Sequence, residues 1–121
     1  MKLPLSTLAV LCLTTLALHI PAHAADAELG LTLVTELALV NGVALACQDM
    51  ATAAKAKKLM LAHAPKTPRF GSAYEEATNA SYLAQVRTAA TCQDAANNDR
   101  KLEVLAKRLQ EALPASPPVA K

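Results

Sequence analysis

The segment Cys47-Gln48-Asp49 occurs a second time as Cys92-Gln93-Asp94, and these two segments decide how the chain is expected to fold. Each lies between two stretches of helical periodicity. The cysteine is expected to end one helix, and the aspartate can cap the next, because its carboxylate can accept a hydrogen bond from a backbone N–H of the first turn. A disulfide between Cys47 and Cys92 would therefore tie together the turns of two αα-hairpins. The repetition reflects either a duplication or a chance match in an alanine-rich sequence.

An oxidising compartment, where disulfides persist, is indicated by the N-terminus. Met1 and Lys2 precede an apolar run over residues 3–18, and Pro21-Ala22-His23-Ala24 then places Ala at the −3 and −1 positions of a cleavage site. The pattern predicts a signal peptide over residues 1–24 and a periplasmic or secreted protein. An uncleaved membrane anchor is the alternative, but the run is shorter than the ~20 residues that a membrane span prefers.

The remaining chain is expected to form one helical domain over residues 25–113, followed by a disordered, Pro-rich tail over residues 114–121. Most of its apolar residues are Ala, Leu and Val, of which the small ones bury little surface. The Cys47–Cys92 disulfide would add about 4 kcal/mol to its stability in the chain-entropy model. A redox pair and an intermolecular disulfide are the alternatives. The absence of a C-x-x-C motif argues against a thioredoxin-type dithiol and against c-type haem attachment.

The periodicity predicts an all-α fold, a small four-helix bundle of two αα-hairpins joined by one disulfide. The first helix covers residues 27–46 and is apolar on more than one side, which is typical of a helix buried between neighbours. Gly30 and Asn41-Gly42 are the least favourable positions for a helix in this segment. The second helix is expected to run from its cap, Asp49, to residue 62.

The third and fourth helices follow an interruption over residues 65–71. Ser72 is expected to cap the third helix, with Glu75 completing a capping box. Small residues on one side of this helix predict a close approach to a neighbour, and they are Ala73, Ala77, Ala80 and Ala84. A leucine stripe marks the fourth helix, which ends at Pro114, and it consists of Leu102, Leu105, Leu109 and Leu113.

No combination of residues predicts catalysis, a metal site or a cofactor, so we predict a non-enzymatic protein. His63 is the only histidine after the predicted leader, so a zinc site with two or three histidines cannot form within one chain. Glu75 and Glu76 are adjacent and would point about 100° apart on a helix, which does not suit a general acid–base pair. The glycines are isolated, so no phosphate-binding loop is expected. Eleven basic and ten acidic residues follow the leader, a balance that argues against nucleic-acid binding.

One surface is predicted to contact a partner. No acidic residue occurs between Asp49 and Glu75, whereas five basic residues and then an aromatic residue do. The predicted interaction patch consists of Lys55, Lys57, Lys58, Lys66, Arg69 and Phe70. A positive surface beside an exposed aromatic residue favours docking to an acidic protein face, an anionic lipid headgroup or a cell-wall polymer. The alternative is a solvated lysine face with the aromatic residues in the core.

The segment Cys92-Gln93-Asp94 is followed by a charged terminal helix, in a chain with a leader that contains Cys12, an expected all-helical domain and two further cysteines 45 residues apart. This combination resembles the small periplasmic acid-stress chaperones of the HdeA type, and the resemblance implies a chaperone that is activated at low pH. The chain departs from that family at Leu45-Ala46-Cys47, where no aromatic residue precedes the first cysteine, and in its long apolar first helix.

Three functions follow from these observations, and we prefer the first, a non-catalytic interaction or accessory protein, or an inhibitor, of a larger cell-envelope assembly. The second is an acid-stress chaperone. The third is a small ligand-binding or hydrolytic helical bundle, which the missing catalytic groups disfavour. The apolar first helix is a further expected contact surface. If its leucines are not covered within one molecule, a homo-oligomer through this helix is predicted. They are Leu29, Leu31, Leu39 and Leu45.

Overall fold

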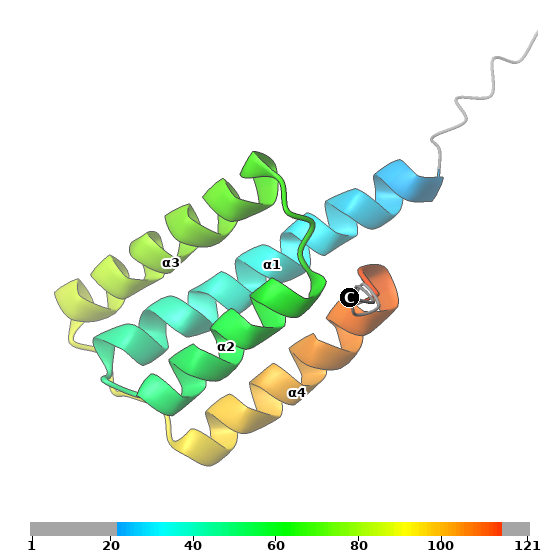
Figure 1. Cartoon of the computed structure of the whole chain (residues 1–121). Coiled ribbons are helices and arrows are strands. Elements are labelled where there is room, and N and C mark those ends of the chain that lie inside the picture. Colours follow the sequence, from blue (N-terminus) through cyan, green and yellow to red (C-terminus); the bar gives the residue numbers. More distant parts are fainter. Residues whose placement is uncertain (1–21, 115–121) are drawn as a thin grey trace, which may run out of the picture.

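The computed structural model describes residues 22–114 and contains four α-helices joined by short connections (Figure 1). They are α1 (Ala22–Ala46), α2 (Met50–His63), α3 (Pro68–Thr88) and α4 (Ala95–Ala112). The prediction of a small all-α, four-helix bundle is confirmed. The predicted signal peptide lies outside the described residues except for its last three, which begin α1, and the predicted tail lies outside them beyond Pro114.

α1 is the central helix of the bundle. It packs against each of the other three helices, and α2 and α4 also pack against each other. α3 packs only against α1, which lies between α3 and α4 (Figure 1). Neighbours on several sides therefore explain the apolar residues on several sides of α1. The second predicted hairpin differs in its packing, because α3 and α4 are consecutive in the chain but lie against α1 rather than against each other.

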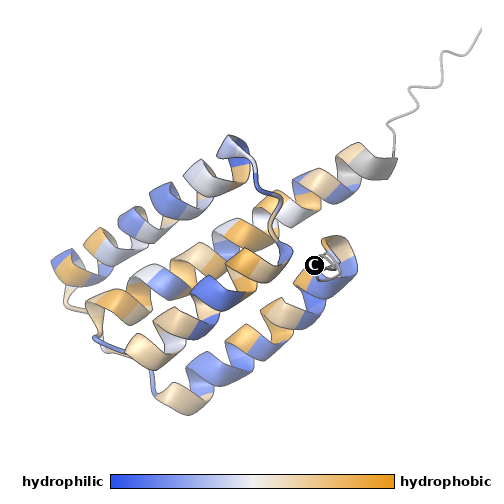
Figure 2. Cartoon of the chain, viewed as in Figure 1, coloured by the Kyte–Doolittle hydropathy of each residue, from blue (hydrophilic) through white to orange (hydrophobic). Residues whose placement is uncertain are grey.

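The core combines one buried stripe from each of several helices. In α1 the side chains of Leu33, Val34 and Leu37 are fully buried. The predicted leucine stripe of α4 is buried except at its last member, which is partly buried against the core. Figure 2 shows hydrophilic and hydrophobic residues alternating along α4, as expected for a helix with one buried stripe. The segment Asp26–Ala46 is long and apolar enough to cross a membrane, but in this bundle many of its residues pack in the core.

α1 is unbroken, and its two glycines lie where other elements come close. A Cβ built at Gly42 would overlap Ser81 Oγ and the carbonyl oxygen of Thr78 in α3. Beside this contact the side chain of Asn41 donates a hydrogen bond to Thr78 Oγ1 at 3.2 Å. A Cβ at Gly30 would lie 2.7 Å from the side chain of a leucine that follows α4. The predicted helix over residues 27–46 is therefore confirmed, and its glycines serve close packing rather than a turn.

The predicted alanine stripe of α3 is only partly correct. Ala73 and Ala77 are partly buried, but Ala80 and Ala84 are exposed. The close approach of α3 to α1 is made possible by Gly42 of α1. A stripe on one helix cannot show which residues of the other helix it meets, and this explains the error.

The start of α3 also differs from the prediction. The helix begins at Pro68, and Thr67 occupies the cap position without a side-chain cap hydrogen bond. Ser72 and Glu75 lie inside the helix, so the predicted capping box is absent. Proline suits the first turn because it lacks the N–H that would be unpaired there, and it holds the preceding residue in an extended conformation.

Both aspartates of the repeated segment cap helices, as predicted. Asp49 accepts a hydrogen bond from the backbone N–H of Thr52 at 3.0 Å, and Asp94 accepts one from that of Asn97 at 2.7 Å. Cys47 and Cys92 form the predicted disulfide, with their Cα atoms 5.8 Å apart. The two copies differ at their cysteines: Cys47 directly follows α1, whereas Cys92 lies in the connection between α3 and α4.

Candidate functional site

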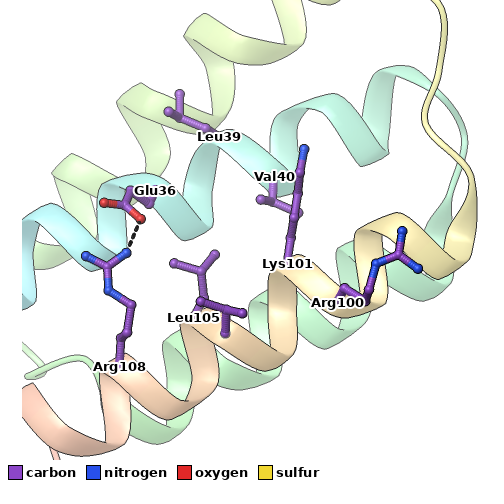
Figure 3. Close-up of a pocket in the computed structure, with 8 residues that line it drawn as sticks. Glu36, Leu39, Val40, Arg100, Lys101, Leu105 and Arg108 are labelled. Atoms are coloured by element: carbon purple, nitrogen blue, oxygen red, sulfur yellow. Dashed lines mark hydrogen bonds and ion pairs between the residues drawn. The ribbon is translucent and has the colours of Figure 1, made fainter.

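α1 and α4 enclose a groove of about 480 Å³ (Figure 3). Its apolar lining comes from Leu39 and Val40 of α1 and from Val104 and Leu105 of α4. Leu105 is buried at the bottom, whereas Leu39 is 45% and Val104 58% exposed. Water therefore covers a concave apolar surface that nothing else in the described chain covers.

Charged side chains border this groove. Glu36 of α1 and Arg108 of α4 form an ion pair across it, with Nη1 and Oε2 2.8 Å apart (Figure 3). Lys101 donates a hydrogen bond to the side-chain oxygen of Gln93 at 2.6 Å, and Arg100 forms no ion pair with any residue between 22 and 114. Because Glu36 neutralises only Arg108, the groove has a net charge of about +2 from Arg100 and Lys101.

The apolar surface continues beyond this groove. A neighbouring hollow of about 290 Å³ shares Leu39, Val40 and Lys101 with it. It extends between α3 and α4 to Gln85 and to the connection that contains Ala90. The uncovered strip of α1 therefore runs along the open side between α3 and α4, which do not contact each other.

The helical repeat explains how α4 builds its side of the groove. Arg100, Val104 and Arg108 are four residues apart, so they lie on one side of α4, next to Lys101 and Leu105. This site was not predicted from the sequence, because the leucine stripe indicates only which side of α4 is buried. A signal was present: Val104 is an apolar residue outside that stripe and lies between two arginines.

The predicted basic patch does not form one surface. Three of its cations already have partners within the chain. Lys55 forms an ion pair with Asp99 at 2.6 Å, and this hydrogen bond raises the pKa of Lys55. Lys66 donates to the carbonyl oxygen of Leu61 at 2.5 Å, and Arg69 forms an ion pair with Glu28. The charges are therefore less available to a partner than their density in the sequence suggests.

The members of that patch also lie on different sides of the molecule. Lys57 lines a hollow between α2 and α3, whereas Lys58 lines a different hollow between α2 and α4. Lys66 lies at the end of the bundle near Leu113. Phe70 is only 5% exposed and belongs to the core, so its predicted role as an exposed docking residue is wrong. Successive helical residues point about 100° apart, so a run of lysines along the sequence does not make a surface cluster.

A second polar arrangement lies where the turn after α1 meets α4. The second carboxylate oxygen of Asp49 accepts a hydrogen bond at 3.1 Å from the side chain of Asn98, which is buried in the first turn of α4. Hydrogen bonds from Thr52, which have the largest effect, and from Asn98 lower the pKa of Asp49. The carboxylate thus joins α2 to α4. Asp49 was predicted as a cap, but its bond to Asn98 links residues far apart in sequence and was not predicted.

The remaining titratable groups of the described chain include His63 and Tyr74, and neither is placed as a metal ligand or an acid–base catalyst. Among residues 22–114 no three His, Cys, Asp or Glu side chains gather as metal ligands. His63 Nδ1 lies 2.8 Å from the carbonyl oxygen of Leu113 and so links the ends of α2 and α4. Burial raises the pKa of Tyr74 to about 12, which is far from the neutral range where an acid–base catalyst works best.

No family model, no curated protein and no solved structure matches this chain.

Proposed function

We propose that this protein is a non-catalytic interaction or accessory protein, or an inhibitor, of a larger cell-envelope assembly, and that the α1–α4 groove is its contact surface. One observation carries the proposal: an uncovered apolar floor lies beside two cations, Arg100 and Lys101, that have no carboxylate partner in the described chain. Exposed apolar surface with a charged border is typical of binding sites. The cations would also attract a negatively charged partner over a distance of about 8 Å at physiological salt.

Export to the periplasm or out of the cell is part of this proposal. The predicted leader over residues 1–24 supports it. The Cys47–Cys92 disulfide supports it independently, since structural disulfides persist mainly in oxidising compartments.

The groove favours an acidic protein segment over the other anionic partners. A protein can place apolar side chains against Leu39 and Val104 while its carboxylates reach Arg100 and Lys101. A cell-wall polymer or a lipid headgroup offers charge, but it offers no apolar group that would fill a recess between two helices. The apolar floor would then remain in contact with water.

A photo-crosslinking amino acid at position 104 tests this proposal, because Val104 is exposed within the groove. In the cell envelope we expect an adduct with one protein, and we expect the Arg100→Glu, Lys101→Glu double variant to lose it. The matched control, Lys58→Glu with Lys66→Glu, changes the charge by the same amount at two positions outside the groove, and it should keep the adduct. An adduct that survives the groove variant and disappears in the control would show that Lys58 and Lys66, rather than Arg100 and Lys101, attract the partner.

A second candidate function, an acid-stress chaperone, is favoured by the Asp49 arrangement. Protonation of this carboxyl group would weaken the hydrogen bonds that join α2 to α4, and so acid would loosen the bundle. This function predicts that the protein exposes apolar surface near pH 3 and prevents aggregation of acid-unfolded client proteins. Dye binding and light scattering at that pH measure both effects, and a protein that leaves client aggregation unchanged is not such a chaperone.

A further inference from the structure

A second groove, of about 620 Å³, lies between α2 and α3 with α1 as its floor. Apolar side chains are uncovered along it: Met50 is 54% and Leu61 60% exposed, and Leu45 of α1 is exposed as well. We propose that α2 and α3, which border this groove, pack against the same two helices of a second copy, α2 against α3, so that the protein forms a twofold-symmetric dimer. This proposal does not depend on a partner in the α1–α4 groove.

The charges at the border support a second copy as the occupant. Lys57 of α2 and Glu75 of α3 line the groove from its two walls, and both are exposed. Neither forms an ion pair with another described residue. A twofold interface joins the same surface of two molecules, so that surface must be complementary to itself. One cation and one anion on opposite walls meet this requirement.

The positions of these two residues along their helices make the pairing geometrically consistent. α2 and α3 run antiparallel from the connection over residues 64–67 (Figure 1). Lys57 lies six residues before the end of α2, and Glu75 lies seven residues after the start of α3. At a rise of about 1.5 Å per residue, both are about 10 Å from the connected ends, and so at similar heights across the groove. A twofold axis between them places Lys57 opposite Glu75 of the second copy, and Glu75 opposite its Lys57.

The α1–α4 groove does not meet the same requirement. Two copies joined there would bring two surfaces together that each have a net charge of about +2, and like charges across an interface repel. The α2–α3 groove also has an adaptable lining, because methionine side chains fit irregular surfaces. Gly71 of α3 also lines this groove, and a Cβ built there meets no atom within 4 Å, so the groove is open at this position.

Sedimentation equilibrium of the purified, disulfide-bonded protein tests the dimer. We expect the wild-type protein to dimerise, and we expect Lys57→Glu and Glu75→Lys to weaken dimerisation about tenfold or more, because each variant creates two like-charge contacts. An equimolar mixture of the two variants should regain dimers, since each of the two contacts in a heterodimer again joins one acidic and one basic side chain. A wild-type protein that stays monomeric, or a mixture that dimerises no better than its components, would overturn the proposal.

Gly71→Gln distinguishes a blocked interface from a damaged fold. A Cβ at position 71 meets no atom within 4 Å, so a longer side chain can start into open space beside the groove, and glutamine favours a helix more than glycine does. We expect this variant to lose dimerisation while its thermal unfolding temperature, measured at a concentration where the wild-type protein is monomeric, stays the same or rises. A Gly71→Gln variant that dimerises as tightly as the wild-type protein would show that this groove is not the interface.

Discussion

Gly42 sets the distance between α1 and α3, and its replacement separates two opposing effects. Gly42→Ala improves helix propensity by about 1 kcal/mol. The added Cβ, however, overlaps backbone atoms of α3, which cannot move aside as a flexible side chain can. We expect a net loss of about 1–3 kcal/mol in the free energy of unfolding, measured by urea denaturation. Gly71→Ala is the matched control, because its Cβ enters open space, and we expect it to stabilise the protein by about 0.5–1 kcal/mol. Equal effects of the two substitutions would contradict the close contact at Gly42.

Asp49 is the residue through which pH is expected to act on stability. The pKa of Asp49 in the folded protein lies below its ordinary value of 3.8, so its stabilisation is complete above that value and is lost as the pH falls through the folded pKa. We expect Asp49→Ala to lower the free energy of unfolding by about 1 kcal/mol at pH 7, and the difference from the wild-type protein to shrink below about pH 4. Denaturation at a series of pH values measures this. Glu76→Ala removes an exposed carboxylate and should change stability by less than about 0.5 kcal/mol at each pH. A deficit of Asp49→Ala that stays constant down to pH 2 would argue against the proposed role of the charge.

At the scale of the elements, α3 is the helix that depends most on the disulfide. It packs only against α1, and the Cys47–Cys92 bond joins the connection after its last residue to the turn after α1. We expect Cys47→Ala with Cys92→Ala to cost about 4 kcal/mol of stability. Hydrogen exchange in this variant should show that amides of α3 exchange first, while those of α1, which packs on three neighbours, exchange last. Similar protection of α1 and α3 after loss of the disulfide would mean that the contact at Gly42 alone holds α3 in place.

The elements that could be predicted are those with local signals. The number of helices, the two aspartate caps and the leucine stripe of α4 each depend on residues within a few positions of one another. The disulfide could be predicted because Cys47 and Cys92 are the two cysteines after the predicted leader. The start of α3 was missed because a proline at the first helical position was interpreted as part of an interruption. The α1–α4 groove was missed for a different reason: Leu39 and Arg100 meet only after folding, and neither is unusual within its own helix.

At the scale of the whole molecule, α1 contributes to two separate grooves, one beside α4 and one between α2 and α3. The groove with α4 has a net positive charge, whereas the groove with α2 has one cation and one anion, so the two grooves suit different occupants. We therefore expect the two sites to act independently. Gly71→Gln should abolish dimerisation but keep the crosslink from position 104, and the Arg100→Glu, Lys101→Glu variant should lose the crosslink but keep the dimer.

Sedimentation and crosslinking of both variants, under the same conditions, measure the two activities separately. Independence has a structural reason, because the two grooves lie on different sides of α1 and share no lining residue. Loss of the crosslink in Gly71→Gln would show that only the dimer presents a complete binding surface. In that case the partner must contact residues from both copies, and the groove between α1 and α4 would be one half of a larger site.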